Sequence, residues 1–244
     1  YIRDKKNLLI ILDTNKKELV QASDALNYFE IENTIILDHH DLGETSLDAG
    51  LRIIDNETSS TCEMIANLIE MYNIELDPYY ATLILSGIVL DTNNFTLKTN
   101  SETYYAAYYL SSMGASTKKV QYLLKQDLKD YIERQKVITN VDILDKRIAI
   151  AKGSPYMIYR REDLAKIADT LLFFNDIEAS FVIAKSTSNT IAISGRSMGK
   201  YNIASILTPL GGGGSNLSGA ARINDSTITK VETKLKTILK KEDE

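Results

Sequence analysis

The first third of the chain alternates short apolar runs with polar turns. Residues 7–12 and 34–37 are apolar and rich in β-branched side chains, and polar residues follow each run. This pattern is typical of parallel strands buried on both faces. Residues 18–29, which lie between them, have helical spacing, so the pattern predicts a strand–helix–strand unit with a right-handed crossover. A third apolar run, residues 83–90, also predicts a strand.

Helix signals follow in the middle of the chain. Ser60 precedes an apolar helical stretch that begins at Cys62, and Glu63 stands three residues after Ser60, which is the spacing of a capping box. Pro78 fits the first turn of the next helix, where its missing N–H loses no hydrogen bond. Helical patterns continue over about 101–113 and 117–138.

The character of the sequence changes near Arg147. Strands are predicted over 148–151, 179–184 and 190–194, the last two paired, and a helix over 161–173. A glycine run and a C-terminal helix complete this part.

We therefore predict an α/β protein in three parts. Residues 1–125 form a parallel-sheet domain, residues 126–146 a connecting helix or linker, and residues 147–244 a smaller α/β domain. The connecting helix is expected to act as a hinge between two domains that face each other across a cleft.

Composition narrows the classes to which this chain can belong. Its 244 residues include 44% hydrophobic and 25% charged side chains, as in a soluble globular protein of one or two domains. A formal net charge of -5 argues against a broad surface for long nucleic acid. The single cysteine excludes an internal disulfide bond and suits a reducing compartment. No apolar run approaches the roughly 18 residues that cross a bilayer. Tyr1 in place of methionine suggests the C-terminal part of a longer protein.

The only two histidines of the chain stand side by side, in Asp38-His39-His40, at the end of the second predicted strand. Imidazoles are common metal ligands, and carboxylates are the hard ligands that Mg²⁺ and Mn²⁺ prefer. Asp13 and Asp91 also follow predicted strands. Because ligands of open α/β sheets bind outside the carboxyl ends of the strands, we expect Asp13, His39 and Asp91 to converge on a divalent cation.

Such a site has a definite chemistry and a structural alternative. A bound cation would lower the pKa of its water ligand and give a hydroxide nucleophile near neutral pH. An aspartate after a strand, however, is often a turn former or a helix N-cap. Asp38 can also orient an imidazole through its second nitrogen without touching a metal.

The glycine run, Gly211 to Gly214, is the second candidate for binding chemistry. Glycines let backbone N–H groups approach an anion closely, and Arg196 upstream can form a forked contact with a phosphate. The alternative is a flexible linker, the usual role of Gly/Ser runs. An ordered pattern resumes at residues 218–221, which favours a position inside a domain.

These motifs resemble those of the DHH phosphoesterase superfamily, and residues 147–244 resemble its DHH-associated domain. Three triplets are similar to the second, third and fourth metal motifs of the family: Asp13-Thr14-Asn15, Asp38-His39-His40 and Asp91-Thr92-Asn93. Further stretches resemble the GdpP-type cyclic-di-AMP phosphodiesterases within that superfamily: 59–61, 86–92, 95–99, 168–172, 178–183 and 196–199, with Asn202.

The resemblance implies a phosphodiesterase with two Mn²⁺ ions. Asp13 would bridge the ions, and His39 and Asp91 would complete one of them. His40, with Asp38 beside it, would face the substrate phosphate as the catalytic pair. The nucleotide would be held on the second domain by Arg196, Ser197, Asn202, Gly212, Gly213, Gly214 and Ser215. The reaction would be attack of metal-bound hydroxide on cyclic di-AMP, which gives linear pApA.

The resemblance also implies partners and a location. The substrate would be a small cyclic dinucleotide and not long nucleic acid. Such enzymes are usually the cytoplasmic end of a protein anchored in the cell membrane, with sensory domains upstream. This chain would therefore reach the membrane only through a segment before residue 1, and a homodimer is left open.

Three features depart from the family pattern. The first metal motif, His-x-x-x-Asp-x-Asp, is absent before Asp13, so we predict that this chain alone is inactive or nearly so and that an N-terminal segment completes the site. Ser215 stands where the glycine run of the family ends in histidine, which removes a cationic contact. Asp41-Leu42 replaces two arginines and puts a negative charge near the phosphates.

Three functions therefore compete. The first is a phosphodiesterase acting on cyclic di-AMP, and the second is a nano-RNase acting on pApA or short oligonucleotides. The third is a nucleotide-binding regulatory module without catalysis, which Ser215 and the missing motif favour. Hydrolysis of cyclic di-AMP compared with pApA separates the first two, and tight binding without turnover would identify the third.

Overall fold

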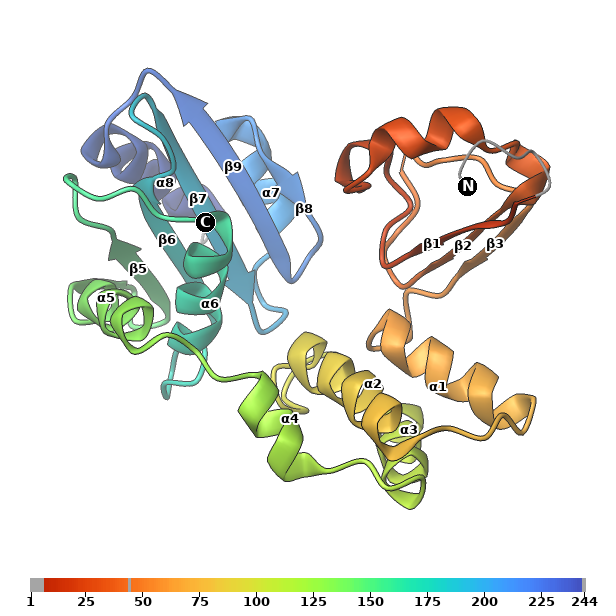
Figure 1. Ribbon diagram of the computed structural model, residues 1–244. Coiled ribbons are helices and arrows are strands. Elements are labelled where there is room, and N and C mark those ends of the chain that lie inside the picture. Colours follow the sequence, from red (N-terminus) through yellow and green to blue (C-terminus); the bar gives the residue numbers. More distant parts are fainter. Residues whose placement is uncertain (1–6, 44, 243–244) are drawn as a thin grey trace. The chain divides into compact units, whose positions relative to one another are not determined.

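A computed structural model describes residues 7–43 and 45–242 of the chain. The chain divides into two compact units, Tyr1–Lys125 and Gln126–Glu244, and each is described by itself (Figure 1). Within the described ranges, no helix combines the length and the apolar character that crossing a membrane requires.

The first unit contains a three-stranded parallel sheet in the order β1-β2-β3. Its strands are β1 (Leu9–Leu12), β2 (Thr34–Asp38) and β3 (Leu51–Ile54). The first two strands and their parallel direction confirm the prediction, and the register pairs Leu12 with Leu37. The sequence pattern does not predict β3, because this short segment includes Arg52 and is largely exposed.

Between β1 and β2 the chain forms short 3-10 helices where the pattern predicts one α-helix over residues 18–29. They are η1 (Lys17–Leu19), η2 (Ser23–Tyr28) and η3 (Ile31–Asn33). None of their residues is buried, and no side chain caps their first turns. An amphipathic α-helix gains most of its stability by burying its apolar face, so helical spacing alone does not produce one here. The prediction was wrong in helix type.

The strand predicted over residues 83–90 is also wrong, since these residues lie within α2 (Pro78–Asp91). Asp77 caps this helix by accepting a hydrogen bond from the Tyr79 backbone N–H at 2.7 Å, and Pro78 occupies the first turn as predicted. An apolar run does not by itself distinguish a buried helix from a buried strand. The buried apolar residues of α2 recur at helical spacing: Ala81, Leu85 and Ile88.

Three further helices complete the first unit: α1 (Thr61–Met71), α3 (Ser101–Ser112) and α4 (Thr117–Leu123). The Ser60 hydroxyl accepts a hydrogen bond from the Glu63 backbone N–H at 3.1 Å, which confirms Ser60 as the N-cap of α1. The Glu63 carboxylate accepts from the Ser59 N–H at 3.2 Å, one residue before the N-cap. Ser59, Ser60 and Glu63 are all buried, so these hydrogen bonds at the start of α1 are shielded from water.

The second unit is built on a six-stranded mixed sheet in the order β4-β5-β6-β7-β9-β8. The strands are β4 (Val141–Leu144), β5 (Ile148–Lys152), β6 (Ala179–Lys185), β7 (Thr190–Ser197), β8 (Gly213–Gly214) and β9 (Ser218–Asn224). The helices are α5 (Leu128–Ile138), α6 (Arg161–Leu171), α7 (Ile203–Leu207), η4 (Thr208–Leu210) and α8 (Ile228–Glu242). The strands predicted over 148–151, 179–184 and 190–194 and both predicted helices are confirmed.

Residues 126–146, predicted as a connecting helix or linker, contribute to this second unit. The helical pattern over 117–138 is broken, because α4 ends at Leu123 and the Asp127 carboxylate starts α5 by capping two backbone N–H groups. α5 then packs against α6 and β5, and β4 extends the sheet as an antiparallel edge strand.

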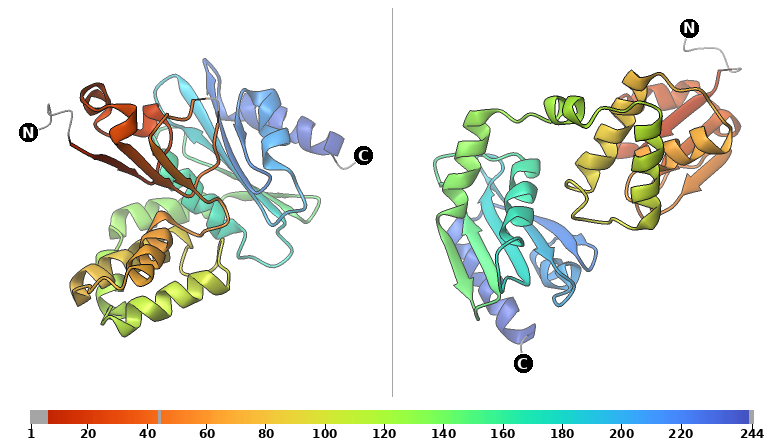
Figure 2. Two further views of the ribbon diagram at one scale, coloured as in Figure 1. Left: turned by 90° about the vertical axis from the view of Figure 1, so that its right-hand side faces the viewer. Right: turned by 90° about the horizontal axis from the view of Figure 1, so that it is seen from below.

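The second sheet lies between helices on both faces, as Figures 1 and 2 show. α6 packs on one face, against a cluster that includes Val182 and Ala192. α7 and α8 cover the other face, where Phe181 is fully buried. Both units thus combine a sheet with helices, and the predicted α/β class is confirmed.

The packing of α1 on α2 predicts a measurable cost for adding one methyl group at Gly87. A Cβ atom there would lie 2.2 Å from the Cys62 Sγ atom. In an isolated helix, alanine is more favourable than glycine by roughly 1 kcal/mol. Overpacking a helix interface costs about 1–3 kcal/mol. We therefore expect Gly87→Ala to lower the free energy of unfolding.

The matched variant is Cys62→Ala, which removes the sulfur atom that the new methyl group meets. In urea unfolding, the double variant should lose less stability than the two single variants added together. Strict additivity of the two single effects would contradict the contact.

Candidate metal centre

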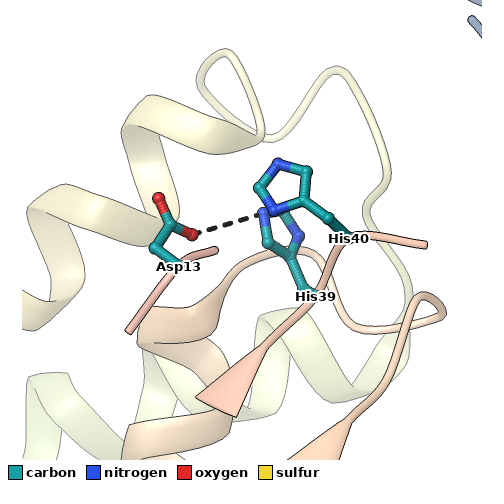
Figure 3. Close-up of side chains that lie close together, drawn as sticks. All are labelled: Asp13, His39 and His40. Carbon is teal, nitrogen blue, oxygen red and sulfur yellow. Dashed lines mark ion pairs between the residues drawn. The ribbon is translucent and has the colours of Figure 1, made fainter. Parts of the chain in front are cut away.

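Asp13, His39 and His40 come together at one edge of the parallel sheet (Figure 3). Asp13 directly follows β1, and the two histidines directly follow β2. Each residue offers one ligand atom, and the three atoms lie within 4.8 Å of one another. His39 Nε2 is 3.6 Å from Asp13 Oδ1. Within the described residues, Asp13, His39 and His40 form a group of side chains whose spacing suits a metal ion.

The backbone and one hydroxyl fix the position of Asp13. Its N–H donates to the Leu37 carbonyl oxygen at 3.0 Å, and its φ of 65° lies in the left-handed region. That conformation costs a non-glycine residue roughly 1–2 kcal/mol, and such strain concentrates at functional sites. The Thr61 hydroxyl donates to Asp13 Oδ1 at 2.9 Å. The sequence places Thr61 at a helix start and in a stretch that resembles the family, but neither feature links it to a residue 48 positions away.

Asp38 is fully buried and faces His40. Its Oδ1 lies 2.7 Å from His40 Nδ1 and accepts the His40 backbone N–H at 3.2 Å. Asn15 donates to the other carboxylate oxygen at 2.6 Å. Because a carboxylate accepts hydrogen bonds, this contact favours the His40 tautomer with the proton on Nδ1 and leaves Nε2 free to interact. The contact fits the alternative in which Asp38 orients an imidazole through its second nitrogen.

The donor set fits a divalent cation. One carboxylate and two imidazoles suit Mn²⁺, Zn²⁺ and similar metals, which accept mixed oxygen and nitrogen ligands. His39 is buried, with Nε2 facing Asp13, and its other ring nitrogen, Nδ1, has no hydrogen-bond partner among the described residues. Buried polar atoms without partners are rare in folded proteins and mark positions that need a functional explanation.

Asp91 reaches this region from a different element than the sequence pattern suggested. It is the last residue of α2, not the end of a strand, and it lies outside the group of three close ligand atoms. Its pKa is raised because surrounding protein atoms remove part of its hydration and because the Asp13 charge is near. His39, His40 and Lys98 act in the opposite direction. Asp91 thus shares the electrostatic environment of the site.

In the second unit, Arg196 is already engaged by protein atoms. Its Nε donates to Asp169 Oδ1 at 2.7 Å, and its Nη1 donates to the Gly195 carbonyl oxygen at 2.9 Å. Partial burial raises the pKa of Asp169, while Arg196 lowers it. Of the three guanidinium nitrogens of Arg196, Nη2 is the one without a protein acceptor within the described ranges.

Ser197, Asn202 and Ser215, three more of the predicted nucleotide ligands, form local hydrogen bonds. The buried Ser197 hydroxyl accepts from the backbone N–H groups of residues 199 and 201. Asn202 is the N-cap of α7, and Ser215 accepts from the N–H groups of residues 217 and 218 in the turn before β9. These contacts explain the residue types without a ligand.

Steric contacts within the second unit explain most of the glycines in the run. A Cβ at Gly212 would lie 2.4 Å from the Ala220 carbonyl oxygen, and one at Gly214 would lie 2.2 Å from the Ser218 carbonyl oxygen. The Gly212 N–H donates to the Leu207 carbonyl oxygen at 3.0 Å, so it is not available to a phosphate. Gly213 is different, because a Cβ there would meet no atom within 4 Å.

Comparison with known proteins adds independent information. Residues 1–88 match the DHH family, N-terminal domain. The chain is 38% identical over 232 residues to the cyclic-di-AMP phosphodiesterase GdpP of Geobacillus thermodenitrificans, covering 94% of this chain and 35% of that protein. It is 37% identical over 235 residues to the cyclic-di-AMP phosphodiesterase PdeA of Listeria monocytogenes, covering 95% of this chain and 35% of that protein. The chain thus spans about a third of the length of these relatives.

The fold also occurs in a solved structure. An exopolyphosphatase-related protein from Bacteroides fragilis superposes with a TM-score of 0.79 at 21% sequence identity, covering 97% of this chain and 72% of that one. At this identity the likeness concerns the fold alone.

The buried Asp38 carboxylate predicts a stability difference between two asparagines. Asn15→Ala removes a buried donor from Asp38, so we expect it to lower the free energy of unfolding by about 1–3 kcal/mol. Asn56→Ala is the matched control, because Asn56 donates to the exposed Asp41 at 2.7 Å. Its effect should stay within about 0.5 kcal/mol in the same urea titration. Equal losses for both variants would show that Asp38 does not depend on its buried donor.

Two neighbouring glycines give a second matched pair. Gly212→Ala should destabilise the second unit by about 1–3 kcal/mol, because the methyl group would overlap backbone atoms of β9. Gly213→Ala should change stability by less than about 0.5 kcal/mol, since its methyl group meets open space. Thermal unfolding of the two variants checks this, and a larger loss for Gly213→Ala would contradict the register of β8.

Proposed function

Because this chain belongs to the DHH family, we propose that it is the phosphodiesterase part of a protein that hydrolyses cyclic di-AMP to pApA. The observation that carries the proposal is the convergence of Asp13, His39 and His40 within 4.8 Å at the carboxyl edge of a parallel sheet. That edge lies within the residues that match the family. The substrate is taken from the names of relatives that are 34–38% identical to this chain.

Each side chain of the site has a proposed role. Asp13 and His39 hold a divalent cation, Mn²⁺ in this proposal, and Asp91 contributes to the same site. A divalent cation supplies a lower pKa for a bound water and neutralises charge on a phosphodiester. His40, oriented by Asp38 through Nδ1, keeps Nε2 available to the substrate phosphate. Thr61 and the Leu37 carbonyl hold Asp13 in place.

The number of available ligands supports a metal site that residues outside the described part of the protein complete. Two cations need more ligands than Asp13, His39 and Asp91 supply, so we propose that further ligands come from outside the described residues. Residues 1–244 alone would then bind metal weakly and turn over slowly. A tether to the membrane and a homodimer stay predictions.

The second unit is proposed to bind the nucleotide. Nη2 of Arg196 is the guanidinium nitrogen that remains available to a phosphate, while Asp169 holds the rest of the side chain in place. Ser215 contributes a hydroxyl at most, because it also holds its own turn.

A non-catalytic nucleotide-binding module is the second candidate, and the small number of clustered ligands favours it. A protein that includes the sequence upstream of residue 1 separates the two: tight binding of cyclic di-AMP with no pApA formed in Mn²⁺ would select the regulatory module.

Asp13→Asn tests the ligand assignment without disturbing the backbone, since asparagine tolerates the left-handed conformation. In the full-length protein with Mn²⁺, we expect the rate of pApA formation to fall by at least ~100-fold, because losing a ligand costs more than losing a residue that only orients one. Calorimetry should show weaker Mn²⁺ binding by residues 1–244 of the same variant.

Asp24→Asn is the control, since Asp24 is an exposed aspartate of the same unit on the short helix η2. It should retain wild-type turnover. An Asp13→Asn enzyme with unchanged turnover would remove Asp13 from the site, and residues 1–244 that bind two Mn²⁺ and turn over at the full-length rate would contradict a metal site completed by residues outside the described part.

A further inference from the structure

The loop that follows the two histidines is tied back to the metal centre by hydrogen bonds of Ser46, a residue without a role so far. The Ser46 hydroxyl donates to Asn15 Oδ1 at 2.7 Å, although the two residues are 31 positions apart in the sequence. The same oxygen accepts from the Gly43 backbone N–H at 2.9 Å, so the single hydroxyl proton is free to serve Asn15. One residue further, the Leu47 N–H donates to the Asn15 carbonyl oxygen at 2.7 Å. Asn15 is therefore held by this loop through both its side chain and its backbone.

The Asn15 side chain connects Ser46 to Asp38. Asn15 is only 1% exposed, and within the described residues the Ser46 hydroxyl is the one donor to its Oδ1 atom. On the other side of the amide, Nδ2 donates to Asp38 Oδ2 at 2.6 Å and faces the His40 carbonyl oxygen at 3.3 Å. Turning the amide around would set Oδ1 against two oxygen atoms with no hydrogen between them, so the contacts fix its orientation.

Asp38 in turn connects Asn15 to the ring of His40, which lies beside Asp13 and His39 (Figure 3). The Asp38 Oδ1 atom lies 2.7 Å from His40 Nδ1. Hydrogen bonds that follow one another in poorly hydrated surroundings strengthen each other, and removing one end leaves a buried polar atom without its partner. Loss of the Ser46 hydroxyl would therefore loosen Asn15, then the Asp38 carboxylate, and finally the ring of His40.

We propose that Ser46 is a positioning residue for His40. Acting through Asn15 and Asp38, it keeps the proton of the neutral His40 ring on Nδ1 and thereby keeps Nε2 directed at the substrate phosphate. Ser46 itself contacts neither the metal nor the substrate. The part played by Nε2 rests on the proposed function, whereas the chain of contacts from Ser46 to His40 requires neither metal nor substrate.

The first experiment measures the tautomer of His40 by ¹⁵N NMR of metal-free residues 1–244, at a pH of about 9, where an imidazole is ordinarily neutral. The chain has only two histidines, so the spectrum contains two imidazole rings, and His39 serves as the internal reference. In the unchanged chain, His40 should carry its proton on Nδ1. Ser46→Ala should add signals of the tautomer with the proton on Nε2 of His40 and leave the His39 signals in place.

Two further variants separate positioning from a general effect on the loop. Thr45→Ala is the matched control, because it removes the neighbouring hydroxyl, which donates to Glu18 at 3.2 Å on the exposed surface. It should leave both rings unchanged. Ser46→Thr keeps the hydroxyl and should retain the tautomer of the unchanged chain. Thermal unfolding of each variant shows that the spectra compare folded proteins.

The second experiment measures hydrolysis of cyclic di-AMP by the full-length protein with Mn²⁺. Ser46→Ala should lower kcat roughly 3–10-fold, less than the 10–100-fold loss usual for a residue that directly supports a ligand. KM should change by less than about twofold, because only the orientation of His40 in the transition state is affected. The variant that combines Ser46→Ala with Asn15→Ala should be no slower than Asn15→Ala alone, since Ser46 acts through Asn15.

Three results would overturn the proposal: unchanged His40 signals in Ser46→Ala, the same change of signals in Thr45→Ala, or multiplicative losses of kcat in the combined variant. The NMR experiment also separates this inference from the proposed hydrolase. A full-length protein without turnover would contradict the hydrolase and leave the His40 result standing. An active protein whose His40 signals ignore Ser46→Ala would contradict only the role of Ser46.

Discussion

The candidate site depends on the parallel pairing of β1 with β2. The register sets Leu12 opposite Leu37, so the residues that follow both strands emerge at one edge. The Asp13 N–H then donates to the Leu37 carbonyl oxygen at 3.0 Å, which holds Asp13 in its left-handed conformation. A slip of one residue would turn every side chain of the strand to the other face and separate Asp13 from His39.

A buried carboxylate organises the rest of the site. Asp38 is one residue from His39 in sequence, yet it is not one of the three close ligands, and its carboxylate binds Asn15 and His40 instead. Burying a charge is costly unless donors surround it, and three hydrogen bonds meet that need here. The same contacts select one tautomer of His40, so the stability of this edge and the chemistry offered by His40 have a common cause.

In the second unit, hydrogen bonding separates residues that build the fold from residues that are available to a ligand. Ser197 and Asn202 satisfy backbone N–H groups, and Arg196 is held by Asp169.

The sequence by itself determined the α/β class, the strands β1, β2, β5, β6 and β7, and the cap at Ser60. It also placed Asp13 and His39 directly after β1 and β2. It could do so because these features follow from local patterns of apolar, capping and turn residues. Only the tertiary structure decided that residues 83–90 form a helix, that Thr61 supports Asp13, and that Asp169 engages Arg196. Those outcomes depend on which elements pack together. An apolar run or a single arginine in the sequence does not indicate which residues will be its neighbours in the folded protein.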